Sequence, residues 1–262
     1  MNAPSSLFIS HGSPMHALDR GAATQAWEQL GQTLPRPRAI LVMSAHWETR
    51  QPMLTGTLQP ETIHDFVGFP EELYRIRYAA PGDPALALRA KELLADAGFA
   101  AAIDGLRGLD HGAWSPLLHM YPQADIPVMQ LAVQTALGPQ HHYALGRALG
   151  SLAGDGVLLI GSGHMTHNLR DWMLQMRDPQ PASYALEFQS WVRQRLIRGE
   201  HDQLIDYRHQ APHAARAHPT EEHFLPLLFA LGAAGREAAA ECIYDGIDGH
   251  VLAMDAWLFR PR

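Results

Sequence analysis

Histidine is the residue type in this sequence with the greatest potential for chemistry. The chain has 16 histidines but a single cysteine, Cys242, which excludes an intrachain disulfide and a cluster of thiolate metal ligands. A transition-metal site in this chain must therefore be built from imidazole and carboxylate groups. The positions of the histidines along the chain indicate where such a site would form.

Three short apolar segments, each predicted to be a buried strand, lead directly into histidines. In open α/β sheets, ligands bind beyond the carboxyl ends of the strands. A single histidine at a strand end is more often a hydrogen-bonded polar residue than a ligand, but several at one sheet edge predict a metal site. The segments and their histidines are 6–10 with His11, 39–44 with His46, and 157–160 with His164 and His167.

Two more histidines are candidates for the same site. His223 stands at the start of a predicted helix over 221–232, and His111 follows a loop within Asp110-His111-Gly112. His164 and His167 are three residues apart, so in an extended turn we expect only one of them to face the site. The other would face solvent or contact the site through a neighbouring group.

The order of the predicted elements favours an α/β fold. Short apolar segments alternate with longer amphipathic ones, as in βα units around a sheet. We predict a single domain over 1–262, with a central largely parallel or mixed sheet flanked by helices and a metal site at the C-terminal ends of the strands. The predicted strands are 6–10, 39–44, 127–133 and 157–160, the helices 22–34, 84–97, 184–198 and 221–232, and the loops 51–83, 138–142 and 208–218.

The composition excludes several functional classes. Hydrophobic residues make up 47% of the chain and charged residues 18%, with a net charge of -7. This charge gives no electrostatic reason to bind nucleic acid or an anionic membrane. The chain lacks an apolar run of about 18 residues, and Met1–Ile9 lacks the basic and apolar regions of a signal peptide. We expect a cytoplasmic protein, either a monomer or a homodimer.

Motifs from nearly the whole chain resemble one enzyme family. They occur in the order found in the class III extradiol ring-cleavage dioxygenases, the LigB-like superfamily, and most closely in its single-chain branch of 4,5-DOPA dioxygenase extradiol-like proteins. The motifs are Phe8-Ile9-Ser10-His11-Gly12-Ser13-Pro14-Met15, Ser44-Ala45-His46-Trp47, Ile63-His64-Asp65-Phe66 with Gly68-Phe69-Pro70, Asp110-His111-Gly112 with Trp114, Thr166-His167-Asn168-Leu169, and Pro219-Thr220 with Glu222-His223 and Leu225-Pro226-Leu227-Leu228.

The resemblance implies a set of metal ligands. His11, His46 and His223 would hold the metal, and His167 would be a possible fourth ligand in a resting or zinc-loaded form. The two-subunit relatives use two histidines and a glutamate, the facial triad of Fe(II) oxygenases. Glu222 is therefore the alternative third ligand.

The resemblance also implies the catalytic residues. His167 would act as acid and base with an ordinary pKa of about 6.5, and His111 would hydrogen-bond the substrate or oxygen. His64 and His111 would line the substrate pocket. Arg75 and Arg77, in the 51–83 loop, are candidates to meet a substrate carboxylate.

The implied reaction inserts both atoms of O2 into a catechol-type ring, DOPA-like or otherwise substituted, and opens it. Fe(II) would support this activity. Zn(II) can occupy the same site in the purified protein. Two alternatives remain at this point. One is a zinc-dependent amide or ester hydrolase with Asp65, Asp110 or Glu222 as its base. The other is a metal-binding protein without catalysis.

Overall fold

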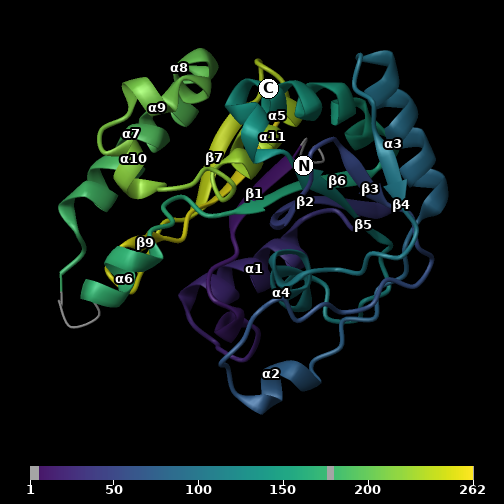
Figure 1. Ribbon diagram of the computed structural model, residues 1–262, viewed down its shortest axis with the longest axis horizontal. Helices are drawn as coiled ribbons and strands as arrows, with labels where there is room; N and C mark the ends of the chain where they lie inside the picture. Colours follow the sequence, from purple (N-terminus) through teal and green to yellow (C-terminus); the bar gives the residue numbers. More distant parts are fainter. Residues whose placement is uncertain (1–5, 176–179, 262) are drawn as a thin grey trace.

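The computed structural model describes residues 6–175 and 180–261. The first five residues of the segment Met1–Ile9 lie outside the described residues, as do 176–179 and 262. A twisted sheet runs through the middle of the molecule, with helices on both sides (Figure 1). Its strand order is β4-β3-β5-β2-β6-β1-β10-β7, and β8 and β9 form a separate pair.

The strands of the described chain are short, as in most α/β proteins. They are β1 (Ser6–Ser10), β2 (Ala39–Glu48), β3 (Met53–Thr55), β4 (Ala102–Asp104), β5 (Val128–Val133), β6 (Val157–Gly163), β7 (Ala239–Tyr244), β8 (Ile247–Asp248), β9 (Leu252–Ala253) and β10 (Ala256–Arg260).

Eleven α-helices and three 3-10 turns connect the strands within the described residues. The helices are α1 (Ala22–Thr33), α2 (Glu71–Arg75), α3 (Pro84–Asp96), α4 (His111–Met120), α5 (Gly138–Leu149), α6 (Leu169–Gln175), α7 (Ser183–Arg198), α8 (His201–Ile205), α9 (Tyr207–Gln210), α10 (Ala214–Ala217) and α11 (Leu225–Ala234). The turns are η1 (Pro14–Ala17), η2 (Thr135–Leu137) and η3 (Gly150–Asp155).

The sheet is mixed. The central strands β1, β6, β2 and β5 are parallel, whereas β10 pairs antiparallel with β1 and with β7. At the other end β3 is antiparallel to β5 and parallel to β4. The parallel centre brings the C-terminal ends of β1, β2 and β6 to one edge. The predicted fold class, an α/β fold with a mixed central sheet flanked by helices, is confirmed.

Alternate residues of the central strands pack on opposite faces. Leu7 and Ile9 of β1 contact the cluster that contains Trp27 of α1 and Trp114 of α4. Phe8, between them, belongs to the cluster formed with α7 and α11. Because both faces are buried, these strands read as continuous apolar runs in the sequence. No helix within the described residues has both the length and the apolar character needed to cross a membrane.

The helix predicted over 221–232 begins later, at Leu225. Pro226 occupies the first turn of α11, where its missing N–H is not needed. The residues before it form a turn, in which the N–H of Phe224 bonds to the carbonyl of Glu221. His223 therefore lies in this turn and not in the helix.

The three predicted loops were wrong in part. Segment 138–142 is the start of α5, because Pro139 is at a favourable N-terminal position of the helix. Segment 208–218 contains α10 and most of α9. Segment 51–83 contains β3 and α2 but is otherwise irregular.

Candidate metal centre and active site

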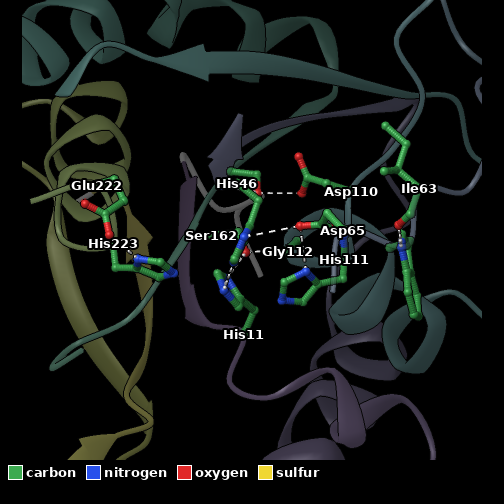
Figure 2. Close-up of polar contacts among 12 residues, drawn as sticks. His11, His46, Ile63, Asp65, Asp110, His111, Gly112, Ser162, Glu222 and His223 are labelled. Atoms are coloured by element: carbon green, nitrogen blue, oxygen red, sulfur yellow. Dashed lines mark hydrogen bonds and ion pairs between the residues drawn. The ribbon is translucent and has the colours of Figure 1, made fainter. Parts of the chain in front are cut away.

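Three imidazole rings converge at the edge of the sheet where β1 and β2 end. His11 follows β1, His46 lies near the end of β2, and His223 approaches from the turn before α11 (Figure 2). Their candidate ligand atoms all lie within 4.8 Å of one another. The Nε2 atoms of His11 and His46 are 2.9 Å apart. Two nitrogens each about 2.1 Å from an ion and at right angles to each other are roughly 3 Å apart, so this spacing fits a shared metal ion.

Hydrogen bonds at Nδ1 set the tautomers of two of these rings. The Ser162 hydroxyl donates to the carbonyl of Gly112, so its oxygen accepts a hydrogen from Nδ1 of His11, 2.9 Å away. Nδ1 of His223 donates to Oε1 of Glu222 at 3.0 Å. Both Nε2 atoms keep a free lone pair. Nε2 of His223 is buried and has no hydrogen-bond partner among the described residues. A metal ion would satisfy this otherwise costly buried atom.

The position of Glu222 differs from that of a ligand of this trio. Its carboxylate contacts Nδ1 of His223, not the Nε2 that faces His11 and His46. Glu222 therefore orients His223. His223, and not Glu222, belongs to the group with His11 and His46 that could hold a metal ion, so its role as third ligand stays a prediction.

Asp65 connects the candidate metal ligand His46 to His111. Its Oδ2 accepts a hydrogen bond from Nδ1 of His111 at 2.9 Å and lies 3.2 Å from Nδ1 of His46. Its Oδ1 accepts from the backbone N–H of His111. Burial alone would raise the pKa of Asp65, but the contacts with His111 and His46 outweigh it and lower the pKa to about 2. The ionised carboxylate fixes both rings with their Nε2 atoms free.

We expect the variant Asp65→Asn to weaken metal binding and activity. An amide has no charge, and its NH2 group would face a donor in either orientation, the two ring Nδ1 atoms or the backbone N–H of His111. Loss of such a partner typically reduces metal affinity or activity by about 10- to 100-fold. Competition against a chelator would give the affinity, and Asp96→Asn on the exposed end of α3 is the matched control. Unchanged affinity and turnover in Asp65→Asn would contradict this role.

Crowding and burial keep the rings of the site neutral. Burial lowers the pKa of His46 to about 3 and that of His167 to about 4, with the nearby ring of His111 adding to both shifts. Burial and the neighbouring rings hold the pKa values of His11 and His223 well below 6.5. These rings therefore present lone pairs at pH 7. His167 differs here from the ordinary pKa expected from the sequence, since the strand edge buries it.

His164 and His167 both line the cavity, contrary to the expectation that only one would. The ring of His167 stacks on that of His223, with centroids 3.5 Å apart and planes 13° apart. His164 donates its backbone N–H to the carbonyl of His223 at 2.7 Å, and its Nδ1 contacts the carbonyl of Ala253. His164 directly follows the end of β6, and the backbone N–H of His167, three residues later, bonds to the carbonyl of Ala217 at 2.8 Å.

Two glycines permit the close backbone approach that builds this edge. A Cβ on Gly163 would lie 2.1 Å from the carbonyl oxygen of His223. Gly12, next to His11, has φ +67°, and a Cβ there would lie 2.4 Å from the ring of His16. Only glycine avoids both conflicts.

A cavity of about 360 Å³ opens over the histidines. Its walls beyond the rings are mainly apolar, which suits an aromatic substrate. Besides His11, His46, His111, His164, His167 and His223, the side chains that form these walls include Phe66, Phe69, Leu169, Trp172, Met173 and Leu252.

His64 occupies a different place from the one the resemblance implied. Phe66 and Phe69 of the same loop line the cavity, whereas Nε2 of His64 contacts the carbonyl of Ile76 at 3.1 Å and the ring packs against Phe66 and Trp114. His64 is absent from the described lining of the cavity, and its role in substrate binding stays a prediction. His111 does line the cavity.

Sequence reasoning missed the groups that hold the rings in place. Asp65 was considered only as a base for hydrolysis, and Ser162 was not considered at all. The available signal for Ser162 was a polar residue that closely follows the apolar run 157–160, two residues before His164. The sequence carries no signal for the contact between Asp65 and His46, which depends on how the 51–83 loop folds back.

The fold and the site define a class of enzyme. Residues 5–251 match the family described as the catalytic LigB subunit of aromatic ring-opening dioxygenase. The chain belongs to this family, whose extradiol dioxygenases are oxidoreductases that use a metal. The prediction of a ring-opening dioxygenase is confirmed, and it is favoured over the hydrolase and non-catalytic alternatives.

Individual relatives match the chain over almost its full length. The "4,5-DOPA dioxygenase extradiol" of Beta vulgaris is 44% identical over 263 residues, which is 98% of this chain and 97% of the relative. The protein of the same name from Escherichia coli K12 is 42% identical over 95% of this chain and 92% of its own length. A crystal structure of an uncharacterized Escherichia coli K12 protein has a TM-score of 0.82 at 36% identity and covers 98% of this chain and 99% of that one.

Proposed function

We propose that this enzyme is an extradiol dioxygenase that opens a DOPA-like or otherwise substituted catechol with both atoms of O2. His11, His46 and His223 would hold a single Fe(II) ion. The observation that carries this proposal is the convergence of their three imidazoles, with each Nδ1 engaged by an oxygen and each Nε2 left free. The names of the relatives support a catechol substrate.

Three protein ligands on one side suit this chemistry. Ferrous iron, when bound, would supply Lewis acidity, electron transfer to O2 and open positions for both reactants. The same donors suit Zn(II), which binds imidazole sites more tightly than Fe(II) does. Zinc in an isolated sample would therefore not indicate a hydrolase.

His167 and His111 would handle protons and hydrogen bonds. His167 is neutral at pH 7, because burial lowers its pKa to about 4, and it faces the cavity beside His223. It can accept a proton from a catechol hydroxyl and return one later in the reaction. His111 directs its Nδ1–H to Asp65, so its Nε2 can accept a hydrogen bond from a substrate hydroxyl.

The apolar walls would orient the ring and keep water away. Phe66 and Phe69 offer faces for aromatic contacts, and Trp172 lines the same cavity. A dry cavity also strengthens the hydrogen bonds made by His167 and His111. We further propose that the enzyme acts in the cytoplasm as a monomer or homodimer, with no nucleic-acid or membrane partner.

Metal exchange tests the proposed function. We expect protein that is stripped of metal and reloaded anaerobically with Fe(II) to consume O2 in proportion to catechol, giving a yellow ring-opened product. An oxygen electrode and visible absorbance would follow the reaction, and zinc-reloaded protein is the matched control that should be inactive. Absence of O2 uptake with every catechol, despite stoichiometric iron, would refute extradiol cleavage.

A further inference from the structure

The cavity contains a carboxylate that the proposed chemistry does not use. Asp65 and Asp248 are the acidic residues of its described lining, and Asp65 is already engaged by His46 and His111. Asp248 lies at the end of β8, on the wall that also carries Leu252. No lysine or arginine of the described chain lines this cavity.

Asp248 is ionised and contacts the ring of His16. Its Oδ2 lies 3.3 Å from Nε2 of His16, and this contact lowers the pKa of the carboxyl. His16 itself packs below Gly12 and edge-on against Trp27. The Asp248 side chain is 45% exposed, so part of it stays free to meet a ligand.

Trp172, another residue of the cavity lining, packs against the turn that follows Asp248. A Cβ on Gly249 would lie 1.9 Å from Nε1 of Trp172, so the turn after Asp248 packs directly on this indole. In Figure 1, β9 and α6, which carries Trp172, lie together at one end of the molecule. A cavity wall that carries both a carboxylate and an indole suits an ammonium group, through charge and through cation–π attraction.

The arginines considered for a substrate carboxylate are engaged elsewhere. Arg75 pairs with Glu71 at 2.6 Å on the surface of α2. Arg77 donates to the carbonyls of Tyr74 and Ile76. Neither lines the cavity. The negative charge of Asp248 is thus the feature of the described wall that would discriminate among substituents.

We propose that Asp248 is a specificity-determining residue that binds a cationic substituent, so that the enzyme prefers catechols with an alkylammonium chain. This inference rests on the proposed function, since it assumes that the catechol ring binds over the histidines. The proposal specifies the substituent on the catechol ring, which could not be determined from the sequence. A catechol with an alkylcarboxylate chain would meet repulsion at the same wall.

The test compares three catechols that differ in the charge of one substituent. We would measure kcat/KM of the iron-loaded enzyme for dopamine, 4-methylcatechol and 3-(3,4-dihydroxyphenyl)propionate. A half-exposed charge pair is worth a modest amount, so we expect dopamine to be favoured over 4-methylcatechol by about 5- to 10-fold. The propionate should be the poorest of the three.

The variant Asp248→Asn should remove this preference. The ratio of kcat/KM for dopamine to that for 4-methylcatechol is expected to fall about 5- to 10-fold. Asp245→Asn is the matched control, because it removes the same charge close by in sequence from a residue that pairs with Arg193 outside the cavity lining. That control should keep the wild-type ratio. An unchanged ratio in folded Asp248→Asn, or a wild-type preference for the propionate, would overturn the inference.

A binding measurement separates this inference from the proposed function. Calorimetry on the zinc-loaded protein would compare tyramine with 3-(4-hydroxyphenyl)propionate, which need no turnover. Tighter binding of tyramine, weakened in Asp248→Asn, supports the role of Asp248 even if no catechol consumes O2. Turnover of 4-methylcatechol without any preference for the amine in either assay would leave the dioxygenase standing and refute the role of Asp248.

Discussion

Replacing His223 by alanine is expected to abolish stable metal binding and, with it, ring opening. Removal of a residue that merely orients a ligand costs about 10- to 100-fold in affinity, so removal of a donor should cost at least about 100-fold. The effect should be large here because Nε2 of His223 is buried and aimed at the other two rings. Iron content after gel filtration and O2 uptake would measure both losses.

The surface variant His209→Ala is the matched control for His223→Ala. Its side chain is 84% exposed and contacts only Asp206 among the described charged groups, so it should keep full metal content and activity. Thermal unfolding of both variants without metal would show whether the fold is intact. A folded His223→Ala protein that retains one iron per chain would contradict the assignment of this ligand.

The second large effect is expected for His167→Ala. We predict that kcat falls by about 100-fold or more while most of the metal remains, as is usual for loss of a general acid–base group. The contact between Nδ1 of His223 and Glu222 does not involve His167, so the third ligand should stay oriented. Single-turnover O2 uptake together with metal analysis would separate the two quantities.

The variant His167→Phe shows whether the loss comes from the base or from stacking. A phenyl ring can still stack on His223, as the imidazole does, but it cannot take a proton. Both variants should therefore be similarly slow. Full activity in either one would remove His167 from the mechanism, and loss of metal from both would make it a fourth ligand.

The part of the fold that positions the site was predictable because it lies on buried parallel strands. Segments 6–10, 39–44 and 157–160 are continuous apolar runs, which is how a strand with both faces covered appears in a sequence. The edge strand β7 and its neighbour β10 were not predicted. β7 lies at the edge of the sheet and is partly exposed, so no apolar run marks it.

Helix α4 was missed because its local sequence argues against a helix. It begins at His111-Gly112 and contains Pro116 in its interior. Burial of Trp114 and Leu117 against the sheet outweighs these local costs. Helix α4 therefore forms because of its tertiary contacts, which a short stretch of sequence does not predict.

The candidate ligands were predictable from strand ends and motifs, whereas their supports were not. Asp65 reaches His46 only because its loop is tied down beside α4. The indole N–H of Trp114 donates to the carbonyl of Ile63, and the N–H of Ile63 donates to the carbonyl of Leu109. These contacts join residues that are far apart in the chain, and no periodic pattern of residue types in the sequence predicts them.

The carboxylate shared by His46 and His111 links two events that are otherwise separate. One of these rings is placed to bind the metal and the other to meet the substrate, and Asp65 contacts both. A change in charge at His46 alters how strongly Asp65 attracts His111, and the reverse holds by thermodynamic reciprocity. Loading of iron and capture of catechol should therefore be coupled, so that each changes the affinity for the other by the same factor.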